Sequence, residues 1–167
     1  EAAECGLACM AMIGRYHGHD IDLNGLRQRF SLSLTGATLR NLMQLAEQLS
    51  LAPRALRVGL QALGNVRLPA ILHWDLNHFV VLKSVSKRKA VIHDPALGAR
   101  TLSIEELSNH FTGVVLELAR AIDPGLADWI AAEGAFPATM VDRIVPATRP
   151  EDIERLARET GVIDLAP

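Results

Sequence analysis

Residues 69–94 read PAILHWDLNHFVVLKSVSKRKAVIHD, and this stretch decides the fold. Three short runs in it, Pro69–Trp74, His78–Val85 and Lys89–His93, are rich in valine, isoleucine, leucine and phenylalanine, a composition that favours β-strands. Between the last two, Ser84–Lys89 indicates a hairpin turn, although it lacks the Asn-Gly or Asp-Gly pair typical of such turns. We therefore expect neighbouring antiparallel strands across this part of the chain.

Upstream of these strands the apolar residues recur with the period of a helix. The spacing predicts helices over Glu1–Tyr16, Leu23–Phe30 and Thr38–Leu49. Because proline cannot continue a helix, Pro53 is expected to stop the third one, and a short strand is expected at Ala55–Val58.

Downstream of residue 94 the pattern alternates between turns and short elements. Ser103 and Glu106 form a capping-box sequence, which predicts the start of a helix running to about Phe111. The other expected features are a turn at Asp94–Gly98, a short strand at Ala99–Thr101 and a last strand at Thr112–Leu118. Three helices followed by an antiparallel sheet predict an α+β fold.

Composition limits the class of protein. The chain has 167 residues, 49% of them hydrophobic, which fits one domain or one domain with an appendage. With 17 basic against 19 acidic residues, the sequence gives no sign of a nucleic-acid partner. No apolar run is long enough to span a bilayer, and Glu1 and Glu4 stand where a signal peptide would be basic. The lack of such a run leads us to expect this chain alone to be soluble. Two cysteines make no disulfide framework, which favours a reducing compartment such as the cytoplasm.

Cys5 lies near the start of the first expected helix, immediately before Gly6. The N-terminus of a helix favours the thiolate form of a cysteine, and a glycine beside it would let a substrate backbone approach closely. Cys5 is therefore a candidate nucleophile; the alternative is a small residue of the core.

His78 and Asp94 lie at the ends of two strands that are expected to be neighbours. That arrangement can place the side chains next to each other, so that Asp94 orients the imidazole while His78 takes the thiol proton. The alternative is that both are ordinary polar residues at strand ends, with Asp94 making a turn before Pro95.

Three segments together resemble the C39 family of cysteine peptidases, over residues 1 to about 118. They are Glu4–Ile13, Leu68–Leu82 and Val91–Ala96. These peptidases are N-terminal cytosolic domains of bacterial ABC transporters that export bacteriocins and related peptides, and they remove a leader peptide after a double-glycine-type site. The resemblance implies a papain-like fold, the catalytic residues Cys5, His78 and Asp94, and no cofactor. It implies as partners a double-glycine leader peptide and the exporter's membrane and ATPase domains, for which this chain has no Walker A motif.

The sequence departs from the family at one point. The family carries a glutamine a few residues before the nucleophile, and its amide contributes to the oxyanion hole. This chain starts too late to contain it, and losing one such donor lowers turnover by roughly 10²–10³. If Glu1 is the true terminus, we expect weak activity, and the alternative function is a leader-peptide docking module that binds the precursor without cutting it.

Further residues are assigned as follows. Trp74 is expected to line the substrate groove or to be buried, and Asn77 is expected to bind substrate or to support the imidazole. Leucines of the expected helix at Thr38–Leu49 either dock a leader helix or pack in the core, which is the more usual role.

A metal site is the alternative for the polar residues near Cys5. Cys5 and Cys9 with His17 or His19 could be ligands, but Cys-x₃-Cys is not a usual zinc spacing, so Cys9 is expected in the core and no metal is predicted. The histidines other than His78 are expected to be structural or solvated: His17, His19, His73, His93 and His110.

Residues 123–167 do not fit the peptidase family. Phe136–Pro146, with Thr148–Glu151 after it, resembles a fragment of the long-chain polyol dehydrogenases, such as mannitol dehydrogenase. The chain has no G-x-G-x-x-G sequence after a strand, so a dehydrogenase activity is the least favoured function. We therefore divide the chain into a peptidase domain, residues 1–122, and a foreign, mostly helical C-terminal segment, residues 123–167.

Overall fold

Helices come first in the chain and an antiparallel sheet follows. The computed structural model describes residues 4–30 and 37–120. Their α+β class agrees with the prediction. The elements are α1 (Cys5–Tyr16), α2 (Leu23–Arg29), α3 (Leu39–Gln48), β1 (Leu51–Arg57), the 3₁₀ helix η2 (Leu60–Asn65), β2 (Ala70–Trp74), β3 (His78–Val85), β4 (Lys89–Asp94), β5 (Gly98–Ser103), α4 (Ile104–Ser108) and β6 (Phe111–Arg120).

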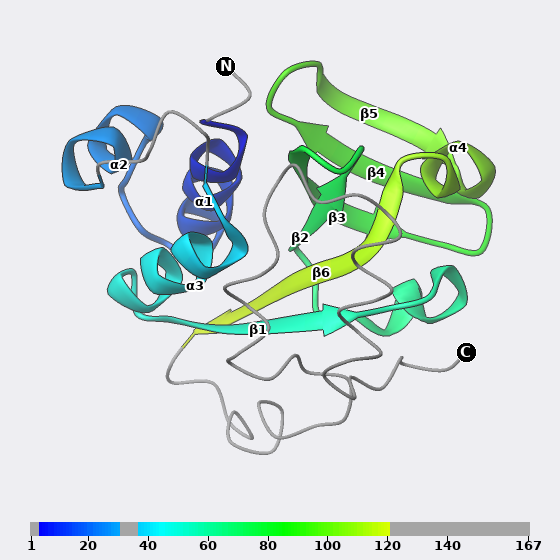
Figure 1. The fold of residues 1–167 in the computed structure, drawn as a ribbon, viewed down its shortest axis with the longest axis horizontal. Helices are drawn as coiled ribbons and strands as arrows, with labels where there is room; N and C mark the ends of the chain where they lie inside the picture. Colours follow the sequence, from blue (N-terminus) through cyan, green and yellow to red (C-terminus); the bar gives the residue numbers. More distant parts are fainter. Residues whose placement is uncertain (1–3, 31–36, 121–167) are drawn as a thin grey trace.

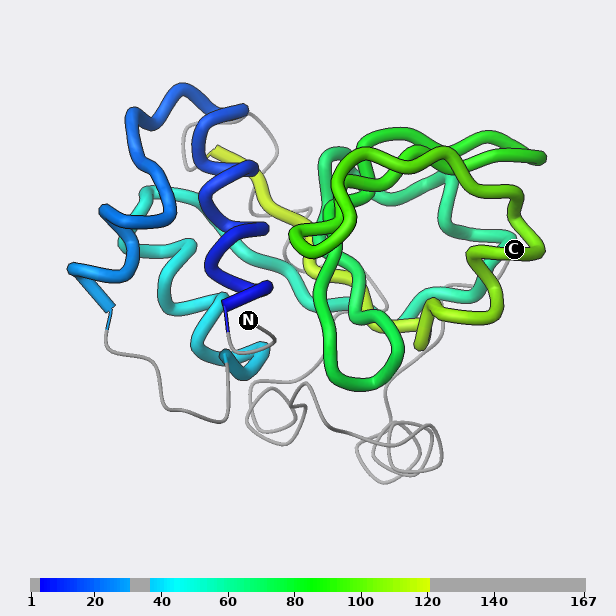
Figure 2. Tube along the Cα trace, turned by 90° about the horizontal axis from the view of Figure 1, so that it is seen from above, coloured from blue at the N-terminus to red at the C-terminus, as the bar shows by residue number. Residues whose placement is uncertain are grey.

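The six strands form one sheet in the order β1-β6-β2-β3-β4-β5. All pairs are antiparallel, and β6, the last strand in the chain, lies between β1 and β2. In Figure 1 the helices α1, α2 and α3 lie together beside the sheet. Seen from above, the strands curl round on the side away from these helices (Figure 2). The sheet therefore has one face toward the helices and one enclosed face.

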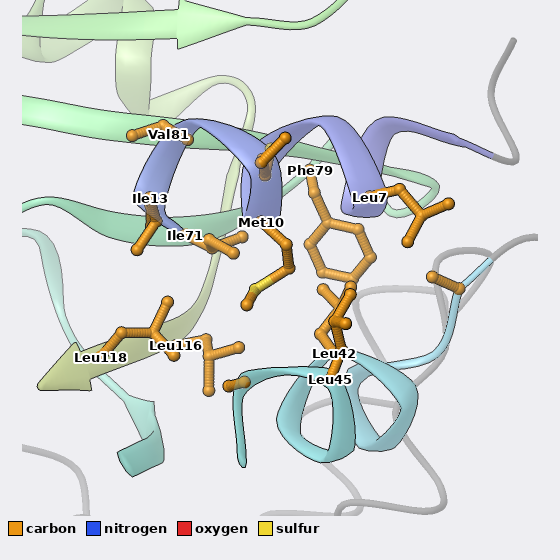
Figure 3. Packing of buried hydrophobic residues seen from close by; sticks show 14 of the residues in the cluster. Leu7, Met10, Ile13, Leu42, Leu45, Ile71, Phe79, Val81, Leu116 and Leu118 are labelled. Atoms are coloured by element: carbon orange, nitrogen blue, oxygen red, sulfur yellow. The ribbon is translucent and has the colours of Figure 1, made fainter. Parts of the chain in front are cut away.

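Two hydrophobic cores follow from this arrangement, because successive residues of a strand point to opposite faces. On β3, Phe79 and Val81 pack with the helices, whereas Val80 and Leu82 belong to the enclosed core. Figure 3 shows the first core, with Phe79 reaching between α1 and α3. Burying α1 in this core fixes its N-terminal end, where Cys5 lies, against the start of β3.

Side-chain caps define where three of the helices begin. Asp22 accepts a hydrogen bond from the backbone N–H of Gly25 at the start of α2. Thr38 and Ser103 each open a helix with a full capping box, α3 and α4 respectively. The capping sequence at Ser103 was predicted to start a helix and does so, but α4 ends at Ser108 because β6 starts at Phe111.

The boundary after α3 differs from the prediction. The helix ends at Gln48, Ser50 adopts a positive φ of 57°, and β1 then starts at Leu51 and includes Pro53. Proline fits here because β1 is an edge strand, where one side of the backbone needs no ladder hydrogen bond. The 3₁₀ helix η2 was not predicted.

Two expectations fall on residues outside the described ranges. They are the start of the first helix at Glu1 and the mostly helical segment at 123–167. Within the described ranges, no helix has the length and apolar composition needed to cross a bilayer.

Candidate active site

Cys5 is the first residue of α1, and its side chain is buried at the edge of a cleft. Backbone N–H groups in the first turn of a helix point out of its N-terminal end, toward the place where negative charge is favoured. Gly6 also has a packing role that the sequence did not indicate. A Cβ added there would lie 2.8 Å from Leu42 Cδ2 and 3.1 Å from Ala37 Cβ, so the lack of a side chain at Gly6 also lets α1 pack closely against the start of α3.

His78 and Asp94 come together as the strand order predicted. His78 starts β3 and Asp94 ends the neighbouring strand β4. The His78 Nε2 atom lies 2.8 Å from Asp94 Oδ1, and the same oxygen accepts a hydrogen bond of 2.8 Å from the backbone N–H of Ala96. The Asp94 carboxylate is therefore held in place from two sides.

The imidazole of His78 connects the carboxylate to the thiol. A hydrogen bond with Cys5 is the main cause that raises the pKa of His78 to about 9; burial opposes this shift, and Asp94 adds to it. Because Asp94 occupies Nε2, the nitrogen left for Cys5 is Nδ1. At neutral pH this imidazole is protonated, and an imidazolium within hydrogen-bond range stabilises a thiolate.

Asp94 keeps its negative charge although its side chain is only 3% exposed. Burial alone would raise the pKa of Asp94, but hydrogen bonds from His78 and from the backbone N–H groups of Ala96 and Leu97 outweigh it and lower the pKa. A thiolate, an imidazolium and a carboxylate in series can carry out nucleophilic catalysis on an acyl group.

The cleft that holds these three residues has a volume of about 810 Å³. Trp74 and Asn77, the two residues assigned to substrate binding, both line it. Trp74 is also buried, as the second alternative given for it expects. The rest of the lining comes from the N-terminal part of α1 and its cap, the start of α2, strand β5 and the turns at the sheet end: Glu4, Ala8, Leu23, Asp75, Pro95, Ala96, Leu97, Arg100 and His110.

Sequence analysis missed two members of the cleft wall. His110, expected to be structural or solvated, stacks on Trp74 with ring centroids 5.1 Å apart and an interplanar angle of 11°. Its Nδ1 lies 2.7 Å from Asp75 Oδ1. Asp75 and His110 are 35 residues apart, and no spacing or motif links them, so only the fold reveals the pair.

Burial decides between the alternative roles left open for Cys9 and for the leucines of α3, and it also bears on His73. Cys9 is fully buried, and burial raises the pKa of its thiol, which confirms the core assignment. His73 is buried and its Nδ1 lies 2.8 Å from Thr112 Oγ1, a structural role. The leucines of α3 are buried in the first core, which confirms packing as their role. Among the described residues, no group of three or more histidine, cysteine or acidic side chains is arranged to hold a metal ion.

Comparison with known proteins agrees with the chemistry of this cleft. The Peptidase C39 family matches residues 1–123. Two Escherichia coli relatives match over 118 residues, 71% of this chain: the colicin V secretion/processing ATP-binding protein at 54% identity and a probable microcin-H47 secretion/processing ATP-binding protein at 52%. The matched part spans only 17% of the length of each relative.

A solved structure extends the match to three dimensions. It is a double glycine motif protease from an AMS/PCAT transporter, in complex with the leader peptide. It superposes with a TM-score of 0.67 at 34% identity and covers 71% of this chain and 85% of that one.

The C-terminal part of the chain has different relatives, as its sequence indicated. D-mannonate oxidoreductase of Escherichia coli strain K12 is 56% identical over 50 residues, and mannitol 2-dehydrogenase of Phaeosphaeria nodorum is 52% identical over 54 residues. Each match covers only 10% of the dehydrogenase.

Proposed function

Since the chain belongs to the Peptidase C39 family, we propose that it is a cysteine endopeptidase that cuts the double-glycine-type leader from a bacteriocin or another exported peptide precursor. The observation that carries the proposal is the hydrogen-bonded series from Cys5 through His78 to Asp94 in one cleft. The structural likeness to a double glycine motif protease supports the same substrate class.

The site suggests a two-stage acyl transfer. The Cys5 thiolate attacks the carbonyl carbon of the second small residue, forming a C–S bond while the carbonyl electrons move to oxygen. The backbone N–H of Cys5, at the start of α1, is placed to stabilise that oxyanion. The intermediate collapses by breaking the C–N bond, and His78 gives its proton to the leaving amine. Water, deprotonated by His78, then attacks the thioester and releases Cys5 as the thiolate.

Each of the other assigned residues has a supporting role in this proposal. Asp94 keeps the imidazole oriented through both stages, because its carboxylate accepts from Nε2. Trp74 and Asn77 line the cleft on either side of the β2–β3 turn and contact the peptide there. The leader is the first partner, and the exporter's membrane and ATPase domains are the others, which would place the domain at the cytoplasmic side of the inner membrane.

Incubation with a synthetic precursor that ends its leader in Gly-Gly tests the proposal. We expect mass spectrometry to find cleavage after the second glycine, and Cys5→Ala to abolish it. Cys9→Ala is the matched control, because it makes the same change one helical turn away in the core and should keep the activity.

Binding of the precursor without any cleavage by the unaltered chain would contradict the enzyme and favour a docking module. Cleavage that survives Cys5→Ala would show that another residue is the nucleophile.

A further inference from the structure

The turn that presents His78 has an unfavourable backbone. Asp75 and Leu76 have φ values of 47° and 66°, and the N–H of Asn77 donates to the carbonyl of Trp74 at 3.3 Å. Two consecutive positive φ angles are the mark of a type I′ turn, for which Asn-Gly is the favoured pair; here Asn77 follows the turn as an extra residue, because Trp74 pairs with His78. Leucine rarely adopts this conformation, because its Cβ crowds the backbone. Contacts outside the turn must therefore hold it.

His110 supplies three such contacts. Its backbone carbonyl accepts a hydrogen bond of 2.9 Å from the N–H of Asp75, and its Nδ1 lies 2.7 Å from Asp75 Oδ1. Its ring stacks on Trp74, the residue before the turn. All three contacts join His110, the residue before β6, to Trp74 and Asp75.

The turn leads directly to the catalytic imidazole. Trp74 is paired with His78 across the β2–β3 hairpin, so a shift of the turn moves the start of β3. His78 must keep Nε2 on Asp94 and Nδ1 toward Cys5 at once, which leaves little room for displacement. A misplacement of about 1 Å at a reacting group can lower the rate by about 10²-fold.

We propose that His110 is a positioning residue for His78: by clamping Asp75 and Trp74 it holds the left-handed β2–β3 turn, and through that turn it sets the imidazole against Cys5. The inference rests on the proposed function. It assigns a role to the Asp75–His110 pair, which has no place in the catalytic series itself. His110 acts through the turn, without touching the peptide bond that is cut.

The test combines removal of the clamp with repair of the turn. His110→Ala is expected to lower kcat on the Gly-Gly precursor, and the alkylation rate of Cys5 at pH 7, by about tenfold or more, with KM little changed. Adding Asp75→Asn and Leu76→Gly installs the Asn-Gly pair that forms a type I′ turn unaided, and should restore most of both rates. The variant that carries only Asp75→Asn and Leu76→Gly measures how far the Asn-Gly turn by itself changes kcat and the alkylation rate of Cys5.

His19→Ala is the matched control, since it removes an imidazole that does not line the cleft and should leave both rates unchanged. If circular dichroism shows that His110→Ala does not fold, His110→Phe replaces it. Phenylalanine keeps a ring to stack on Trp74 but cannot bond to Asp75, and its rates are compared with and without the Asn-Gly turn in the same way.

Three results would overturn the inference: unchanged rates in the His110 variant, a rise in KM alone, or no recovery with the Asn-Gly turn. A rise in KM alone would indicate direct substrate contact. Failure of the proposed function looks different, because the unaltered chain would then neither cut the precursor nor show rapid alkylation of Cys5.

Discussion

At the scale of single residues, the state of His78 depends on Asp94. Replacing that carboxylate by an amide, Asp94→Asn, removes the charge that helps to raise the pKa of His78 to about 9. We expect the alkaline limb of the pH profile of kcat/KM, near pH 9 in the unaltered chain, to move toward neutral pH, and kcat/KM to fall by roughly 10²-fold or more. Asp20→Asn, an exposed carboxylate outside the cleft, is the control. An unmoved alkaline limb would contradict the role given to Asp94.

The same pKa shift makes a prediction about stability. The pKa of His78 is raised from 6.5 to about 9, so the folded chain binds this proton more tightly than the unfolded chain does. The stabilisation is therefore fully present below pH 6.5 and is lost as the pH rises through about 9. We therefore expect urea unfolding between pH 6 and 10 to show that the unaltered chain has the larger free energy of unfolding. Its difference from His78→Gln should become smaller as the pH rises. If the difference in unfolding free energy between the two chains instead grew with pH, the raised pKa of His78 would be contradicted.

At the scale of elements, the close contact between α1 and the start of α3 determines where Cys5 lies. Gly6→Ala places a Cβ against Leu42 Cδ2 and Ala37 Cβ, so the Leu42 side chain must move and Ala37 must shift by a few tenths of an ångström. We expect the free energy of unfolding to fall by about 1–3 kcal/mol, as for other overpacked cores, with a loss of activity. At Gly64 an added Cβ meets nothing within 4 Å, so Gly64→Ala should behave like the unaltered chain. Equal effects of the two changes would show that packing at Gly6 is not the constraint.

Elements with a strong period or a side-chain cap could be predicted from the sequence. The helix at Leu23, the strands at His78 and Lys89 and the capping box at Ser103 all appear close to where they were expected. Local rules failed where the wider fold decides. Pro53 lies within a strand because β1 happens to be at the sheet edge, which no neighbouring residue reveals. The left-handed turn at Asp75 and Leu76 was missed because its support comes from residue 110.

The same limit applies to the site. Cys5, His78 and Asp94 could be proposed because each occupies a recognisable segment, and neighbouring strands bring the last two together. The Trp74–His110 stack could not, because it depends on β6 returning to lie beside β2.

At the scale of the whole molecule, the peptidase fold is expected to be independent of residues 123–167. The residues that match the Peptidase C39 family are 1–123, and β6, the last strand that the structure describes, ends at Arg120. A chain of residues 1–122 should therefore keep its thermal midpoint and its rate of Cys5 alkylation. A thermal midpoint lowered by several degrees in the short chain would place residues 123–167 in the folded unit.

The full chain carries no dinucleotide-binding motif. Calorimetry with and without NAD should therefore show no change in its thermal midpoint.

The central claim is that Cys5 and His78 form an assembled thiolate–imidazolium pair. Iodoacetamide labelling against pH, read at each cysteine by mass spectrometry, tests it most directly, with buried Cys9 as the internal reference. We predict rapid labelling of Cys5 below pH 7 that is lost in His78→Ala, and slow labelling of Cys9 throughout. Slow labelling of both cysteines, rising only near pH ~8.5 as for an ordinary thiol and unaffected by His78→Ala, would contradict the account.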